Sequence, residues 1–308
     1  MRRILSIMTV AALTLTAVCC GCSKQEEQSS KPASAATSDQ AATADQPGSA
    51  TGEKLGKVKV NDSTLGQIWI DELEGVPKNM LNASGFSTEN GLKMYSENGK
   101  PASLEGIDVS SYSGDIDWTR VKQSGIDFVM VRIGGRGYGE EGKLYQDDRA
   151  VEYIKGAQAA GIKAGGYFFS QSVTTGEAKE EADYVRQVLG DIKPDFPIAY
   201  DWELIKEDKA RTDKVTAEQA TENAAAFCRQ AVSYGYTPMV YSTSRELYFK
   251  YDLSKLAEYG IWYSEYSDTP AFYYQFSMWQ YSKEGVVDGV EGKVDLDICF
   301  TGIADYAK

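Results

Sequence analysis

The sequence Phe196-Pro-Ile-Ala-Tyr-Asp-Trp-Glu203 joins a short apolar run to two carboxylates that are separated by one tryptophan. The run from Phe196 to Tyr200 is typical of a buried strand. Because side chains alternate between the faces of a strand, Asp201 and Glu203 should share one face, with Cα atoms roughly 6.5–7 Å apart. At that separation each charge shifts the pKa of the other. Taken alone, such a pair more often marks a solvated loop or a helix cap, so its context decides.

From Gly106 onward, strand-like and helical segments alternate. The predicted strands are residues 106–109, 127–133, 163–170, 196–203, 237–244, 260–266, 276–282 and 294–300. Helical patterns between the first six are residues 116–124, 147–160, 176–189, 216–234 and 245–259. Glycines expected to end helices stand at Gly125, Gly161, Gly235 and Gly260. We therefore predict one α/β domain over residues 102–308, an irregular (β/α) barrel of about eight parallel strands and five helices whose last strands lack full helical crossovers.

Residues 58–101 have a different pattern, with apolar alternation after Gln67 and the turn signals Asn90-Gly91 and Asn98-Gly99. These features predict a small N-terminal β-hairpin module. A lone hairpin is only marginally stable in water, so we expect the module to pack on the barrel.

The N-terminus is typical of an exported protein. In residues 1–22, Arg2-Arg3 precedes an apolar stretch too short for an ordinary spanning helix. The ending Gly21-Cys22 resembles a bacterial lipoprotein cleavage box, which implies lipidation at Cys22; a cleaved signal without an anchor is the alternative. Residues 23–57 are rich in Ala, Ser, Thr and Gln and are predicted to be a disordered tether.

The chain of 308 residues carries a net charge of −13 and contains no histidine. The acidic balance argues against binding to nucleic acid, because no basic stripe is available to contact phosphates. Without histidine, Ser-His-Asp triads, Cys-His dyads and the usual zinc sites are excluded. Carboxylates must do any acid–base chemistry, and neither a metal nor a cofactor is expected. A glutamic acid that donates a proton near neutral pH needs a raised pKa, which Asp201 could produce at Glu203.

Active sites of such barrels lie at the carboxyl ends of the strands. Acids recur at these ends, among them Asp108, Asp201, Glu203 and Asp295. From the pattern alone, Asp108 is more often a turn cap and Asp295 a hydrogen-bond acceptor at a strand end. Aromatic faces hold sugar rings by stacking, although only about half of the aromatics are expected to line the cleft. The predicted substrate-binding residues are Tyr167, Phe169, Tyr241, Trp262, Trp279, Gln280 and Tyr281.

The glycines near residue 135 and two cysteines are expected to have non-catalytic roles. The glycines of Gly134-Gly135 and Gly137-Tyr-Gly139 lack phosphate-loop spacing and are predicted to form a mobile loop over the cleft. Cys228 and Cys299 are expected to be packing residues rather than nucleophiles.

Six motifs follow one another along the chain: Gly106-Ile-Asp-Val-Ser-Ser-Tyr-Ser-Gly-Asp-Ile-Asp-Trp118, Gly165-Gly-Tyr-Phe-Phe-Ser170, Tyr200-Asp-Trp-Glu203, Ile261-Trp-Tyr-Ser-Glu-Tyr266, Trp279-Gln-Tyr281 and Gly292-Lys-Val-Asp-Leu-Asp297. In this order they resemble glycoside hydrolase family 25, the lysozymes that cut peptidoglycan. The resemblance covers about residues 105–306 and implies an irregular (β/α) barrel with five helices. It also implies cleavage of the β-1,4 bond between N-acetylmuramic acid and N-acetylglucosamine.

The resemblance also implies roles for individual residues. Glu203 matches the general acid, and Asp201 matches the carboxylate that steadies either the attacking acetamido group of the substrate or an activated water. Asp108 and Asp295 match the two other acidic positions that line the site, so the resemblance implies a catalytic group of Asp108, Asp201, Glu203 and Asp295. In addition, Asp297 stands where the family often has Asn and Glu265 where a basic residue is common, which predicts a more acidic cleft.

Three functions remain open from the sequence. The first is a membrane-tethered muramidase in the cell envelope, with peptidoglycan strands and the membrane as partners and no protein partner implied. The second is a catalytically weak glycan-binding lipoprotein, since a fold does not determine a function. The third is another D-x-E barrel glycosidase, which ranks lower because chitinase-type motifs carry a further Asp at the position of Ala199.

Overall fold

The computed structural model describes residues 54–206 and 208–303. These residues belong to one compact unit, which is described here by itself. The predicted export signal, the lipidation site Cys22 and the predicted tether up to residue 53 lie outside the described residues. Within the described ranges, no helix combines the length and the apolar character that a membrane span requires.

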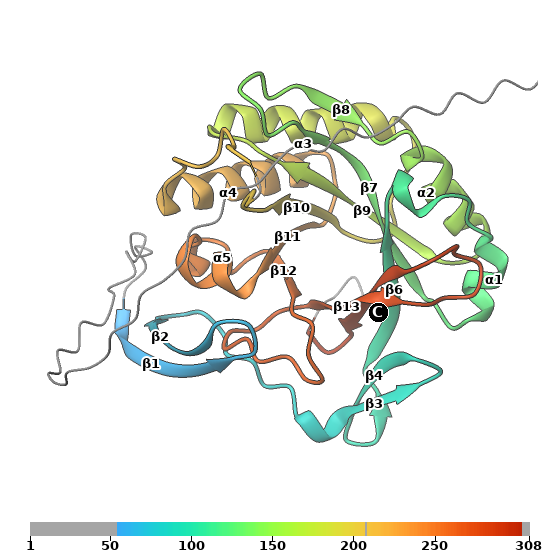
Figure 1. Cartoon of the computed structure of the whole chain (residues 1–308), viewed down its shortest axis with the longest axis horizontal. Helices are drawn as coiled ribbons and strands as arrows, with labels where there is room; N and C mark the ends of the chain where they lie inside the picture. Colours follow the sequence, from blue (N-terminus) through green and yellow to red (C-terminus); the bar gives the residue numbers. More distant parts are fainter. Residues whose placement is uncertain (1–53, 207, 304–308) are drawn as a thin grey trace, which may run out of the picture. The chain divides into compact units, whose positions relative to one another are not determined.

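Eight of the described strands close into a barrel (Figure 1). The barrel closes because the first strand, β6, pairs with both β14 and β7. A short strand, β8 (Leu144–Gln146), adds to the free edge of β7. The predicted α/β barrel of about eight strands and five helices is thereby confirmed. The barrel strands are β6 (Ser103–Val109), β7 (Phe128–Arg136), β9 (Lys163–Ser170), β10 (Ile198–Trp202), β11 (Pro238–Thr243), β12 (Gly260–Ser264), β13 (Met278–Gly285) and β14 (Val294–Phe300).

Strand β14 departs from the expected parallel arrangement. It runs antiparallel to both β13 and β6, whereas the other neighbouring barrel strands are parallel. The reason is the short connection over residues 286–293, because a parallel return needs a crossover of a dozen or more residues. The barrel is therefore mixed, and the beginning of β14 lies at the same rim as the carboxyl ends of the parallel strands.

Five α-helices occur in the described residues, and α2, α3 and α4 lie on the outside of the barrel (Figure 1). The side chains of Asp117, Thr174 and Thr216 accept hydrogen bonds from backbone N–H groups at the starts of α1, α3 and α4, where those groups have no partner within the helix. The helices are α1 (Trp118–Gln123), α2 (Ala150–Ala159), α3 (Thr175–Leu189), α4 (Ala217–Ser233) and α5 (Ser244–Phe249).

The helix-ending glycines were predicted correctly at three positions. Gly125, Gly161 and Gly235 all have positive φ, which suits a residue that ends a helix. The prediction for Gly260 is wrong, because this residue opens β12 and the helix expected over residues 245–259 ends at Phe249. The side chain of Asp252 accepts a hydrogen bond from the Ser254 N–H and starts a separate 3₁₀ turn instead.

Apolar side chains fill the interior of the barrel below the rim. Phe128 and Phe196 stack at the floor with ring centroids 4.5 Å apart, and a Cβ at Gly106 would lie 2.3 Å from the Phe128 ring. The absence of a side chain at Gly106 therefore leaves room for the Phe128 ring. Cys299 belongs to this interior cluster and Cys228 to the core outside the barrel, where both are buried as expected.

The N-terminal module consists of two small sheets rather than one hairpin. Strands β1 (Lys54–Asp62) and β2 (Gly66–Leu73) form an antiparallel pair, while β3 (Phe86–Glu89), β4 (Leu92–Glu97) and β5 (Lys100–Pro101) form a meander. Both Asn-Gly pairs have positive φ, as in the tight turns that the sequence predicted. Strand β1 already begins at Lys54, so the predicted boundary between residues 57 and 58 falls inside a strand and is wrong.

The module packs on the outside of the barrel, as expected. The Phe86 ring meets Trp279 edge-on with centroids 5.7 Å apart. The hydroxyl of Tyr274 accepts a hydrogen bond from the Leu73 N–H at 3.0 Å. A shared apolar core and specific hydrogen bonds therefore hold the module in place.

Candidate active site

Four predicted carboxylates line one cleft of about 320 Å³. Asp108 lies near the end of β6, Asp201 is in β10, and Glu203 directly follows β10. Asp295 stands in β14 opposite Asp108 in the antiparallel register. The reversed direction of β14 thus brings an acid from the beginning of a strand to the rim where the other strands end.

The predicted substrate-binding residues divide into two groups. Tyr167, Tyr241, Trp262 and Gln280 line the cleft, in agreement with the expectation that about half of the aromatics would do so. Phe169 is partly buried and does not line it.

Trp279 and Tyr281, which were also predicted to bind substrate, do not line this cleft. Trp279 is fully buried, and its indole N–H donates to the backbone oxygen of Glu265 at 2.8 Å. Tyr281 lines a neighbouring groove. The physical reason is strand alternation, because Gln280 points into the cleft and the residues on either side of it point to the outer face of the barrel.

Gln280 is the hydrogen-bonding centre of the cleft. Its amide nitrogen donates to Asp108 Oδ2 at 2.7 Å. Its amide oxygen accepts from the hydroxyls of Tyr241, Ser264 and Tyr266 at 3.1, 2.9 and 3.2 Å. One side chain therefore holds a catalytic candidate and two tyrosines in a fixed relation.

Burial raises the pKa of Asp201 well above its usual range, and the charges of Glu203 and Asp108 raise it further, while the Arg132 guanidinium opposes them. Burial is also the main cause that raises the pKa of Glu203, followed by the charge of Glu246. Because repulsion between two charges is mutual, we treat the pair as one unit whose first ionisation makes the second harder. The pair consequently retains a proton at a pH where exposed carboxyls have lost theirs.

Asp297 lies beneath this cleft and is fully buried. It accepts a hydrogen bond from the Trp262 indole N–H at 2.8 Å. Burial raises its pKa well above the usual range, and the charge of Asp108 raises it further. Asp297 does not line the cleft, so it adds no exposed charge there, and its protonated form resembles the neutral Asn expected from the family resemblance.

We expect Asp297→Asn to stabilise the protein near pH 7 and to change stability little near pH 3. Below its ordinary pKa of 3.8, Asp297 holds a proton in the folded and the unfolded state. Above that value the unfolded chain releases the proton while the folded chain keeps it. The free energy of unfolding therefore falls as the pH rises toward the folded-state pKa. Thermal melting at both pH values measures the effect, with the exposed Asp148→Asn as control. An equal shift at both pH values would contradict the buried acid as the cause.

Two cleft residues were missed by the sequence analysis as site residues. Tyr266 and Lys283 line the cleft, and the Lys283 ammonium lies 5.7 Å from the centre of the Tyr266 ring. The charge of Lys283 opposes the burial that raises the pKa of Asp295. Counting alternate residues from Gln280 could not find Lys283, because the register of β13 shifts after Gln280. The aromatic Tyr266 at a strand end was the available signal.

The expectation for Glu265 was wrong, and so was that for Gly134 and Gly135, whereas the loop predicted at Gly137 and Gly139 stays a prediction. Glu265 is buried and accepts backbone hydrogen bonds from Ser63 at 3.3 Å and Ala271 at 2.7 Å. It therefore ties the β1–β2 turn to the barrel and does not make the cleft more acidic. Gly134 and Gly135 belong to β7, and a Cβ at Gly134 would lie 2.2 Å from the backbone oxygen of Tyr145. These glycines allow β8 to approach closely and are not a mobile loop.

No arrangement of three or more His, Cys, Asp or Glu side chains suited to a metal ion occurs within residues 54–206 and 208–303. Besides its acids, the cleft is lined by Tyr167, Tyr241, Trp262, Tyr266, Gln280 and Lys283. Buried carboxyls beside aromatic faces can donate a proton to an oxygen and stabilise positive charge on a bound ring.

The closed α/β barrel and its carboxylates at the strand ends define a protein of the glycosidase class. The family described as Glycosyl hydrolases family 25 matches residues 107–290, and the chain belongs to this family. The match begins after the N-terminal module, so strands β1 to β5 lie outside it.

Among known proteins, the chain is similar to the autolytic lysozyme of Clostridium acetobutylicum, with 27% identity over 202 residues that cover 65% of this chain and 57% of that protein. It thus spans little more than half the length of this relative. The uncharacterized protein YegX of Escherichia coli K12 is 28% identical over 217 residues, which cover 67% of this chain and 73% of YegX.

Two solved structures share the fold. The bacterial lysozyme of Streptomyces coelicolor superposes with a TM-score of 0.54 at 24% identity, covering 66% of this chain and 94% of that one. The modular autolysin LytC of Streptococcus pneumoniae, solved with a synthetic peptidoglycan ligand, has a TM-score of 0.56 at 21% identity and covers 80% of this chain and 57% of its own.

Proposed function

We propose that this protein is a peptidoglycan hydrolase that cleaves the β-1,4 bond between N-acetylmuramic acid and N-acetylglucosamine. The observation that carries the proposal is the pair formed by the buried Asp201 and the half-buried Glu203, which lines one cleft together with Asp108 and Asp295. The family membership and the names of the similar proteins, an autolytic lysozyme and an autolysin with a peptidoglycan ligand, support the substrate class.

In the proposed mechanism, Glu203 donates its proton to the glycosidic oxygen as the bond breaks. Asp201 then stabilises the positive charge that develops on the sugar or on its attacking acetamido group. Tyr167, Tyr241 and Trp262 offer aromatic surface to the sugar rings. For the second half of this mechanism we favour attack by the 2-acetamido group of the substrate over direct attack by water. NMR of the first product anomer tests this step, because initial inversion would exclude assistance.

Digestion of purified peptidoglycan tests the activity itself. We expect reducing-sugar release, with N-acetylmuramic acid at the new reducing ends by mass spectrometry. Reducing-end N-acetylglucosamine would contradict the assigned bond. Binding without release would instead support the weak glycan-binding protein, and faster cleavage of chitin fragments would support a glycosidase for another N-acetylated glycan.

The proposed location is the outer face of the cytoplasmic membrane or the cell envelope, with the chain anchored through a lipid on Cys22. The prediction rests on the sequence Arg2-Arg3, the apolar run and Gly21-Cys22. Cys22→Ala should leave the protein unlipidated and move it from the membrane fraction to the soluble fraction. Cys20→Ala is the matched control and should remain in the membrane fraction. Unchanged retention of Cys22→Ala on cell fractionation would refute the anchor.

A further inference from the structure

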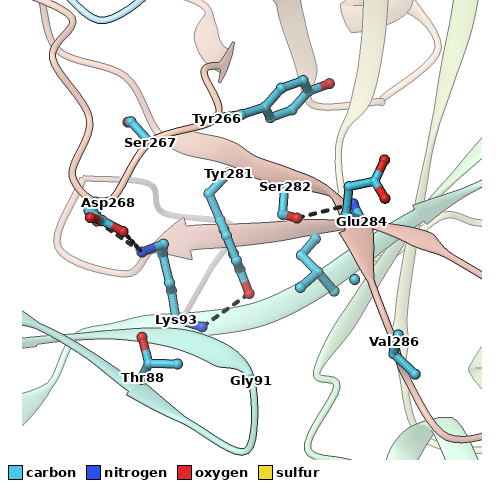
Figure 2. Close-up of a pocket in the computed structure, with 12 residues that line it drawn as sticks. Thr88, Gly91, Lys93, Tyr266, Ser267, Asp268, Tyr281, Ser282, Glu284 and Val286 are labelled. Atoms are coloured by element: carbon cyan, nitrogen blue, oxygen red, sulfur yellow. Dashed lines mark hydrogen bonds and ion pairs between the residues drawn. The ribbon is translucent and has the colours of Figure 1, made fainter.

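A second groove of about 740 Å³ lies beside the candidate active site. The β3–β4 hairpin forms one wall with Thr88 and Lys93, and the barrel forms the other with Tyr266, Tyr281 and Ser282 (Figure 2). Thr88 and Tyr266 lie on opposite sides of it in this view. The hairpin stands outside the matched family range, so this wall is an addition to the family barrel.

The groove and the candidate catalytic cleft adjoin at Tyr266. This residue lines both, and about half of its surface, 51%, is exposed. Its hydroxyl donates to Gln280, which also binds Asp108. Along β13, Lys283 lines the cleft while its neighbours Ser282 and Glu284 line the groove. A polymer bound across the catalytic acids therefore has a direct path over Tyr266 into the groove.

The hairpin wall is held firmly against the barrel. The Lys93 backbone N–H donates to the Tyr281 hydroxyl at 3.0 Å, and its ammonium donates to the backbone oxygen of Asp268 at 2.9 Å (Figure 2). The same ammonium lies 5.8 Å from the ring centres of Trp279 and Tyr281. The groove is thus formed before any ligand binds, which lowers the entropic cost of binding.

The lining of the groove suits sugar rings better than charged peptide. Thr88, Ser267 and Ser282 supply hydroxyls, and Tyr266 and the 78% exposed Val286 supply apolar surface. Sugars present this same combination of hydroxyl edges and apolar faces.

The charged lining of the groove does not suit an acidic ligand. One cation, Lys93, and two acids, Asp268 and Glu284, line it, so the groove has no excess of positive charge. The carboxylates of peptidoglycan stem peptides would therefore gain little there, and a glycan is favoured as the ligand.

We propose that this groove is an accessory subsite for the glycan strand, through which the β3–β4 hairpin gives the protein a preference for long strands. The inference rests on the proposed function, because it places the strand in the catalytic cleft first. Sugars beyond Tyr266 then bind in the groove and lower KM without changing the chemical step.

The experiment compares a peptide-free tetrasaccharide with long peptide-free strands of the same repeat. Wild-type kcat/KM should be roughly tenfold higher on long strands, the gain expected from burying one further sugar ring. Thr88→Trp should remove most of that gain through KM, because the indole fills the groove. Ser87→Trp is the matched control, since it lies on the opposite face of the same strand and should keep the gain.

Val286→Trp should narrow the groove from its opposite wall. It provides a second variant in case Thr88→Trp lowers the melting temperature of the protein. No length preference in the wild type, or equal losses on both substrates in the two groove variants, would overturn the subsite. A preference that requires stem peptides would overturn the glycan as its ligand.

Calorimetric binding to the Glu203→Gln protein separates this inference from the proposed activity. If the wild type cuts no strand but long strands still bind more tightly than the tetrasaccharide, and Thr88→Trp removes the difference, the activity fails and the subsite stands. If strands are cut without a length preference in rate or binding, the subsite fails and the activity stands.

Discussion

Glu203→Gln is expected to lower kcat on peptidoglycan by roughly 10²–10⁴-fold while the fold and glycan binding remain. Glutamine keeps the shape of the side chain but has no carboxylic proton to give to the glycosidic oxygen. Initial rates of reducing-sugar release on purified peptidoglycan measure the loss. The matched control is Glu258→Gln, which changes an exposed residue before β12, at the end of the barrel away from the cleft.

The stability of the same variant checks the electrostatic argument. Burial raises the folded-state pKa of Glu203 above its ordinary 4.5. Above the ordinary value the unfolded chain releases this proton more readily than the folded chain, so the residue costs stability as pH rises. Glu203→Gln should therefore melt at or above the wild-type temperature near pH 7. Near wild-type turnover would refute Glu203 as the acid, and a large drop in melting temperature would show that its role is structural.

Asp201→Asn is expected to lower kcat by roughly 10²–10³-fold, because a preorganised negative charge near the developing positive charge is lost. The variant should also move the basic limb of the pH–rate profile to lower pH. With Asp201 neutral, the buried pair carries one negative charge less, so Glu203 loses its proton more easily.

Full pH–rate profiles of wild type and Asp201→Asn measure this shift. Asp191→Asn, an exposed position after α3, is the control and should leave the profile unchanged. A basic limb that stays in place or moves to higher pH would show that Asp201 does not share its ionisation with Glu203. Unchanged turnover would remove Asp201 from the proposed mechanism.

Several helix ends and turns could be predicted from the sequence, because they depend on the conformational preferences of single residues. The helix-ending glycines at Gly125, Gly161 and Gly235 were recognisable because positive φ suits glycine. The Asn-Gly turns of the N-terminal module were visible for the same kind of reason. The length of helix α5 was overestimated. The Asp252 side chain forms a local hydrogen bond that competes with the helix, and the apolar pattern of residues 245–259 does not reveal it.

The direction of β14 and the packing of the module needed information from distant parts of the chain. The direction of the last strand depends on the length of the connection that precedes it and on which strands of the sheet still have an unpaired edge. Phe86 and Trp279 are far apart in sequence, and nothing local to either residue shows that they meet. The groove between the hairpin and the barrel follows from that contact.

The sequence by itself determined that Asp201 and Glu203 share a face and that the chemistry depends on carboxylates, because alternation along a strand is local and histidine is absent. Only the tertiary structure decided which other side chains join them. Gln280 binds Asp108 across the barrel, and the register shift in β13 brings Lys283 to the cleft. Burial and the approach of charges from separate strands set the pKa values, and both arise only when the barrel closes.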